Sequence, residues 1–130
     1  AIKPGTGVII RYEGPKGGPG MKELHRVTEI MKGIPDSAVI TDGRFSGASG
    51  GLSVGYLCPE AFDGAPIALV ENGDKINIDL TKNLIEVEVS DEEFARRKQG
   101  WKPVIHENGG HLLARYAKQV SSAKTGAVIE

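Results

Sequence analysis

The chain has 130 residues, which predicts one domain over residues 1–130, and its 39% hydrophobic and 25% charged residues are ordinary for a soluble globular protein. A net charge of −1 argues against a nucleic-acid partner, because such partners usually require a basic face. No apolar run approaches the roughly 20 residues of a membrane span, and the single cysteine, Cys58, fits a reducing compartment such as the cytoplasm.

The first half of the chain is predicted to contain two strands and one helix. Residues 7–12 are rich in β-branched side chains and predict a strand. The glycines and prolines of residues 13–20 require a loop, and apolar residues three and four apart predict a helix over residues 21–32. The short apolar run over residues 38–41 predicts a buried strand, whereas residues 52–58 are ambiguous.

The second half is predicted to contain three strands followed by two helices. Turn-forming residues separate the strands, and Ser90 with Glu93 forms a capping box at the start of a charged helix. The expected elements are strands over residues 67–70, 75–80 and 84–89, a helix to about residue 99 with a solvated face over 91–98, a loop over 101–110, and a helix over 111–121.

This order of elements shows little strict alternation of strand and helix. It therefore predicts a mixed, β-rich α/β domain rather than a doubly wound parallel sheet. No internal repeat or linker divides the chain. Neither glycine-rich segment has the Gly-x-x-x-x-Gly-Lys pattern of a phosphate-binding loop or the spacing of a dinucleotide-binding fingerprint.

The most informative segment directly follows the buried strand predicted over residues 38–41. Its sequence over residues 42–51 is Asp-Gly-Arg-Phe-Ser-Gly-Ala-Ser-Gly-Gly. Glycines allow a backbone to approach a ligand closely, and successive free N–H groups form an anion-binding concavity. Ser46 could be held there as an exposed nucleophile or base, although a serine in a glycine-rich turn is often only a turn residue.

Three long motifs occur in order along the chain. They are Tyr-Glu-Gly-Pro-Lys-Gly-Gly-Pro-Gly-Met over residues 12–21, Thr-Asp-Gly-Arg-Phe-Ser-Gly over 41–47, and Pro-Glu-Ala-Phe-Asp-Gly over 59–64. Together they resemble the dihydroxy-acid dehydratase and phosphogluconate dehydratase family over about residues 7–127. The resemblance covers only the family's C-terminal domain, and it implies a barrel-like swivelling β/β/α fold and a larger N-terminal domain that is absent here.

The resemblance also implies a chemistry, the conversion of a 2,3-dihydroxy acid to a 2-keto acid and water in branched-chain amino acid biosynthesis. Ser46 would be the base that takes a proton from carbon 2, as an alkoxide stabilised by metal charge and by the N–H groups of Gly47 and Ala48. Those two residues and Ser49 would contact the substrate. Glu23 would be one Mg²⁺ ligand, since a hard carboxylate suits this ion.

The remaining cofactor ligands would belong to the absent N-terminal domain. That domain would bind an iron–sulfur cluster and most of the Mg²⁺ shell, and Cys58 matches none of the cluster cysteines. By resemblance the full-length protein would be a homodimer, and this chain alone would be inactive.

Structural roles are expected for several other polar residues. Arg44 is expected to pair with Asp42 rather than with substrate, and Glu13 to be solvated or hydrogen-bonded. The first turn of the helix predicted over residues 21–32 would contain Glu23, where an acidic residue also suits the helix dipole. The three histidines lack a shared metal-site spacing and are expected to be structural or exposed; they are His25, His106 and His111.

Two other functions stay open. The sequence Gly-Ala-Ser over residues 47–49 resembles the phosphogluconate branch of the family, whereas the tail over residues 114–123 resembles the dihydroxy-acid branch. A sugar-acid or 6-phosphogluconate dehydratase domain is therefore an alternative. The second alternative is a non-catalytic module whose glycine loops bind an anion or a protein.

Overall fold

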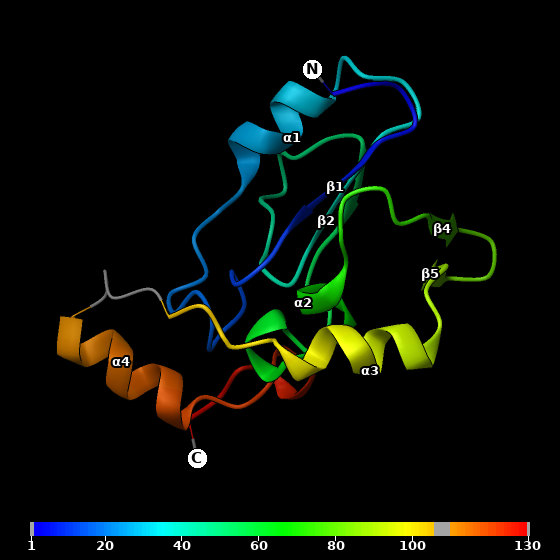
Figure 1. Cartoon of the computed structure of the whole chain (residues 1–130). Coiled ribbons are helices and arrows are strands. Elements are labelled where there is room, and N and C mark those ends of the chain that lie inside the picture. Colours follow the sequence, from blue (N-terminus) through cyan, green and yellow to red (C-terminus); the bar gives the residue numbers. More distant parts are fainter. Residues whose placement is uncertain (1, 106–109, 130) are drawn as a thin grey trace.

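The computed structural model describes residues 2–105 and 110–129. A parallel sheet at its centre has the strand order β1-β2-β3 (Figure 1), with β1 at Gly7–Ile10, β2 at Ala38–Thr41 and β3 at Leu52–Val54. The register places Ile10 opposite Thr41 and Ile40 opposite Val54. Every residue of β2 is buried, which explains its continuous apolar run, because a central parallel strand is covered on both faces.

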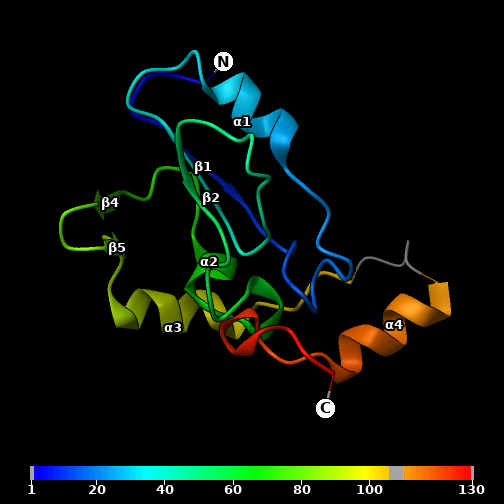
Figure 2. The ribbon, with the colours of Figure 1, turned by 180° about the vertical axis from the view of Figure 1, so that it is seen from behind.

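Helices and a separate hairpin surround this sheet. The remaining elements are α1 (His25–Met31), the 3₁₀ turn η1 (Ala61–Asp63), α2 (Pro66–Leu69), the antiparallel strands β4 (Ile76–Asp79) and β5 (Leu84–Val87), α3 (Asp91–Gln99), α4 (Gly110–Gln119) and the 3₁₀ turn η3 (Ala123–Thr125). The hairpin and α4 lie on opposite sides of the sheet in both views (Figures 1 and 2). Within the described ranges, no helix has the length and apolar character needed to cross a bilayer.

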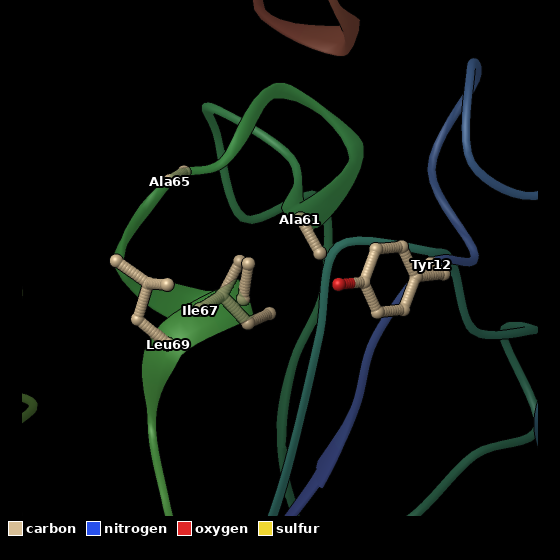
Figure 3. Close-up of a cluster of buried hydrophobic side chains, with 6 residues drawn as sticks. Tyr12, Ala61, Ala65, Ile67 and Leu69 are labelled. Carbon is tan, nitrogen blue, oxygen red and sulfur yellow. The ribbon is translucent and has the colours of Figure 1, made fainter. Parts of the chain in front are cut away.

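A buried apolar cluster lies where β1 ends. Its members are Tyr12, Ala61, Ala65, Ile67, Ala68 and Leu69. The ring of Tyr12 points toward Ala61 and Ile67 (Figure 3). Trp101 packs against the cluster and its Nε1 donates to the Tyr12 hydroxyl at 3.0 Å. The polar tip of the buried ring is therefore satisfied by a residue far along the chain.

The structure confirms the strands predicted over residues 7–12 and 38–41, although the first ends at Ile10. The helix predicted over residues 21–32 is also present but shorter. That helix begins only at His25, with Leu24 as its N-cap. Met21 has a φ of 42°, a left-handed conformation that a helix cannot include. Glu23 therefore lies before α1, and its predicted place in the first helical turn is wrong.

The predicted strand over residues 67–70 is also wrong, because α2 occupies this segment. Pro66 stands at the start of the helix, where its missing N–H costs nothing. Ile67, Ala68 and Leu69 are all buried, and three consecutive buried residues of a short helix give the same apolar run as a buried strand. Arg11 donates to three carbonyls near the end of this turn, those of Ile67, Ala68 and Val70.

The β4–β5 hairpin, α3 and α4 occur where the sequence predicted them, with small shifts of their ends. Of the loop predicted over residues 101–110, residues 106–109 lie outside the described residues. Ser90 caps α3, since its Oγ accepts from the N–H of Glu93 at 3.3 Å. The other half of the expected capping box is replaced by hydrogen bonds from Arg96 and Arg97, which lower the pKa of Glu93 to about 2.

Residues 91–98 are not simply the solvated face that was predicted. Arg97 is half-buried, and its Nη1 donates to Asp74 at 2.6 Å and to the Leu69 carbonyl at 3.0 Å. This side chain therefore joins α3 to the turn before β4 and to the end of α2.

The mixed α/β class is confirmed. The two sheets have strands of three or four residues, and they do not close a barrel within the described residues. The barrel-like form and the β-rich emphasis are therefore not confirmed.

Ile40, at the centre of the sheet, is only 2% exposed. Ile40→Ala should lower the free energy of unfolding by about 2–5 kcal/mol, because it removes buried methyl groups and leaves a cavity. The matched control Ile30→Ala, on α1 where the side chain is 68% exposed, should change it by less than about 0.5 kcal/mol. Urea unfolding followed by Trp101 fluorescence measures both, and equal losses would contradict the central place of β2.

Candidate functional site

The three motifs leave the same edge of the parallel sheet. We call residues 12–21 loop 1, residues 42–51 loop 2 and residues 59–64 loop 3. Loops 1 and 2 start side by side because Ile10 and Thr41, at the ends of β1 and β2, are register partners. Loop 3 follows β3, the third parallel strand, after a short connection. Carboxyl ends of parallel strands are where open α/β sheets usually bind ligands.

Asp42 joins all three loops. It is 1% exposed, and its carboxylate accepts three backbone N–H groups. Oδ2 accepts from Tyr12 at 3.2 Å and from Ala61 at 2.8 Å, while Oδ1 accepts from Glu13 at 3.0 Å. These donors belong to loops 1 and 3, so one buried side chain at the start of loop 2 fixes both of its neighbours.

Glu60 provides a second link between loop 3 and loop 1. Its Oε2 accepts from the N–H of Gly17 at 2.8 Å, and its Oε1 from that of Lys16 at 3.0 Å. Burial raises the pKa of Glu60, and these two donors offset only part of the rise. A Cβ at Gly14 would lie 2.6 Å from Glu60 Oε2, so the carboxylate can occupy this place only because residue 14 has no side chain.

Loop 2 presents the predicted base. Ser46 is half-buried; its Oγ accepts from the Ala48 N–H at 3.3 Å, and its carbonyl accepts from the Ser49 N–H at 3.1 Å. The first contact also occurs in ordinary serine turns, so it orients the hydroxyl without assigning a role. Gly47 and Ala48 are exposed. The buried Ser49 Oγ has no hydrogen-bond partner among the described residues.

The predicted pairing of Arg44 with Asp42 is wrong. Backbone N–H groups occupy the Asp42 carboxylate, whereas Arg44 Nε donates to the Met21 carbonyl at 2.6 Å. An isolated parallel backbone bridge also joins Arg44 to Glu23. Because Ser46 is two residues after Arg44, the structure brings the Glu23 segment beside the serine loop.

Two polar residues of loop 1 form ion pairs. Glu13 lies 3.2 Å from Lys22 Nζ, and Lys16 Nζ lies 2.8 Å from Asp63. His25 lies on α1 with its Nδ1 3.8 Å from Glu29, and His111 is exposed on α4. His106 lies outside the described residues.

Within residues 2–105 and 110–129, Glu23 is the residue that suits the Mg²⁺ that the resemblance implies. Glu23 is exposed and takes part in no ion pair within the described part of the chain, so its carboxylate fits one position of an oxygen shell. The same part holds no group of three or more His, Cys, Asp or Glu side chains suited to a metal. Completing the shell would require ligands from elsewhere.

An iron–sulfur cluster does not fit this chain. Such clusters usually require several thiolates, and Cys58 is the sole cysteine of the sequence. Its Sγ lies 3.2 Å from the Tyr56 carbonyl, to which it donates.

Two cavities lie near the loops, but neither contains the predicted site. The larger, of about 710 Å³, lies between loop 1 and α4 and is lined by Lys16, Pro19, Phe62, Leu113 and Ala117 among others. The smaller, of about 250 Å³, is apolar and lies between the sheet and the hairpin, where Ile9, Ile40, Cys58 and Ile85 line it. Ser46 and Glu23 line neither of these two cavities.

Comparison with known proteins decides the family. The model of the family "Dihydroxy-acid/6-phosphogluconate dehydratase C-terminal" matches residues 1–127. The chain belongs to this family. Two curated relatives, both named dihydroxy-acid dehydratase, come from Francisella tularensis subsp. novicida (strain U112) and Francisella tularensis subsp. tularensis (strain WY96-3418). Each is 50% identical to the chain over 132 aligned residues, and the resemblance drawn from the motifs is confirmed.

The match is unequal in length. It covers 99% of this chain but 24% of each relative, so the chain spans about a quarter of the curated dehydratases that it matches.

Sequence reasoning missed Asp42 and Glu60 as organisers of these dehydratase loops. The available signal was position, because each carboxylate stands within a family motif and Asp42 comes directly after a buried strand. Their hydrogen-bond donors are backbone N–H groups distant in sequence, which no pattern of side chains reveals.

Asp42→Ala should lower the free energy of unfolding by more than about 3 kcal/mol, because three N–H donors would lose their acceptor and a buried unsatisfied group costs about 1–3 kcal/mol. The control Asp63→Ala removes only the surface pair with Lys16 and should cost less than about 1 kcal/mol. Urea unfolding compares them. A loss at Asp42 as small as that at Asp63 would show that the three loops are held by other contacts.

The raised pKa of Glu60 predicts a specific pH dependence. The folded-state pKa of Glu60 lies above the ordinary value of 4.5. The protonated Glu60 carboxyl therefore contributes fully to stability below pH 4.5, and this contribution is lost as the pH rises toward the folded-state pKa. Glu60→Gln should abolish this loss, because the amide stays neutral while its oxygen still accepts from Gly17.

The measurement is urea unfolding of both proteins at a series of pH values that starts below the ordinary pKa of 4.5 and rises through neutral pH. Stability of Glu60→Gln relative to the unaltered chain should rise with pH. The control Glu86→Gln, an exposed change on β5, leaves Glu60 in place and should keep the decline. A relative stability independent of pH would contradict the assigned cause.

Proposed function

We propose that this chain is the C-terminal domain of a dihydroxy-acid dehydratase, which removes water from a 2,3-dihydroxy acid to give a 2-keto acid. The observation that carries the proposal is 50% identity, over 99% of the chain, to two proteins named dihydroxy-acid dehydratase. The arrangement of the loops supports it, because the motif segments that resemble the family leave one edge of the parallel sheet.

In this proposal Ser46 is the base. Its Oγ, as the alkoxide, takes the proton from carbon 2 of the acid while the hydroxyl on carbon 3 departs, and the resulting enol becomes the 2-keto acid. The Ala48 N–H that already donates to Oγ would stabilise the negative oxygen, as oriented backbone donors do in a site shielded from water.

Residues beside Ser46 would hold the substrate. Gly47 and Ala48 are exposed; the N–H of Gly47 can donate to a carboxylate, while that of Ala48 is directed at Ser46 Oγ. The Ser49 hydroxyl, which has no hydrogen-bond partner among the described residues, can orient a hydroxyl of the acid. Glu23 would provide one carboxylate oxygen to Mg²⁺. When bound, Mg²⁺ and an iron–sulfur cluster would stabilise the negative charge that develops on the acid and on the departing hydroxide.

The longer protein would complete the site. An N-terminal domain would contribute the cluster, the other Mg²⁺ ligands and the opposite wall of the active site, and the swivelling arrangement expected of the family would set it against loops 1 and 2. Ser46 and Glu23 line neither cavity described above, which supports a site closed by another domain. We also expect a cytoplasmic homodimer that acts in branched-chain amino acid biosynthesis.

A sugar-acid or 6-phosphogluconate dehydratase is the second candidate. The matched family includes both activities by its description, and Gly-Ala-Ser over residues 47–49 resembles the phosphogluconate branch. A non-catalytic binding module is the third hypothesis, and an open reading frame without a cysteine-bearing domain upstream of this sequence would favour it.

Ser46→Ala in the full-length enzyme should lower the rate of 2-keto acid formation from 2,3-dihydroxyisovalerate by at least about 10²–10⁴-fold, the usual contribution of a positioned base, while the absorbance of the cluster is retained. Ser37→Ala is the matched control, since this half-buried serine lies at the opposite end of β2, and it should keep most of the activity.

The same assay with 6-phosphogluconate separates the two dehydratase candidates. Activity of Ser46→Ala equal to that of the unaltered enzyme would remove the base from the proposal. Robust turnover by the isolated chain would contradict the need for a second domain.

A further inference from the structure

Loop 1 is fixed at both of its ends to residues 42–44. At its start, the N–H groups of Tyr12 and Glu13 donate to the Asp42 carboxylate. At its end, the Met21 carbonyl accepts from Arg44 Nε at 2.6 Å, and Glu23 forms its backbone bridge with Arg44. Two side chains separated by one glycine therefore determine where loop 1 begins and where it ends.

The last residue of loop 1, Met21, has an unfavourable backbone conformation that its contact with Arg44 helps to hold. Met21 has a φ of 42°, a conformation that costs a residue with a side chain about 1–2 kcal/mol. Its N–H donates to the Gly18 carbonyl at 2.8 Å, and its carbonyl is held by Arg44. The neighbouring pair between Lys22 and Glu13 contributes less, because the Lys22 side chain is 73% exposed.

Arg44 lies between the two residues that the proposed function assigns to the reaction. Glu23 is its backbone bridge partner, and Ser46 follows it by two residues. The Arg44 side chain therefore contacts the segment that leads to Glu23, next to loop 2.

We propose that Arg44 is a positioning residue that holds Glu23 beside the serine loop, and that its hydrogen bond to Met21, rather than its charge, is what the site requires. The inference rests on the proposed function for the roles of Glu23 and Ser46. The opposite assignment is a guanidinium that binds the substrate carboxylate through its charge.

Two substitutions separate these assignments. Arg44→Gln places a side-chain N–H donor one bond beyond Cδ, where Nε stands in arginine, and removes the charge. Arg44→Lys retains the charge but places a methylene at that point and the ammonium one bond farther, so the donor is displaced from the Met21 carbonyl. Arg11→Lys is a matched control, because Arg11 also donates to backbone carbonyls but at the end of α2.

Hydrogen–deuterium exchange of the 130-residue chain tests the positioning itself. In Arg44→Lys the peptide covering residues 21–24 should exchange about 2–10-fold faster, as expected from loss of one hydrogen bond. The same peptide in Arg44→Gln and in Arg11→Lys should exchange as in the unaltered chain. Residues 38–41 report on global unfolding, and their exchange should stay unchanged in Arg44→Lys.

Mn²⁺ binding to the full-length enzyme, measured by electron paramagnetic resonance without substrate, tests the consequence for the metal. Arg44→Lys should weaken Mn²⁺ binding by about 10–100-fold, the usual effect of losing a group that orients a metal ligand. Arg44→Gln should bind Mn²⁺ as the unaltered enzyme does, with an unchanged KM for the dihydroxy acid.

The proposal is overturned if residues 21–24 of Arg44→Lys exchange at the original rate. It is also overturned if Arg44→Gln raises the KM while Arg44→Lys does not, because charge and not the donor would then matter. A Glu23→Gln enzyme that binds Mn²⁺ normally would instead remove the ligand role from the proposed function, and the exchange result would still decide whether Arg44 positions this segment.

Discussion

The site depends on one buried carboxylate at the carboxyl ends of the parallel strands. Parallel pairing places the starts of loops 1 and 2 together, but it does not fix the path of either loop beyond the strand ends. Asp42 does so, because its two oxygens accept N–H groups from Tyr12, Glu13 and Ala61. Backbone donors buried at the ends of strands must find acceptors, and here a single residue serves donors from two loops.

Glu60 serves the same purpose at a different energetic cost. It holds Lys16 and Gly17, yet burial disfavours its charge more than these hydrogen bonds favour it, as its raised pKa indicates. Loop 1 is therefore ordered by carboxylates in addition to the apolar packing of Tyr12. This suits a segment rich in glycine and proline, which has few side chains to bury and many N–H groups to satisfy.

The loops are thus held by buried carboxylates on one side and exposed to solvent on the other. Asp42 and Glu60 are buried, whereas Glu23, Gly47 and Ala48 are exposed and Ser46 is half-buried. This buried support under an exposed polar surface suits the active site that we propose between this chain and a second domain.

The sequence by itself determined what local composition controls: the buried strand β2, the Ser90 cap of α3, the glycine loops and, through three motifs, the family. Only the tertiary structure decided that residues 66–69 form a helix and that Glu23 precedes α1 and bridges to Arg44. It also decided that Asp42 binds backbone N–H groups instead of Arg44, and that Glu60 binds backbone N–H groups as well. The physical reason is the distance along the chain between partners. The pattern of apolar residues within a segment indicates whether that segment is buried. The N–H groups that donate to a buried carboxylate such as Asp42 belong to loops that follow other strands, so the pattern cannot indicate them.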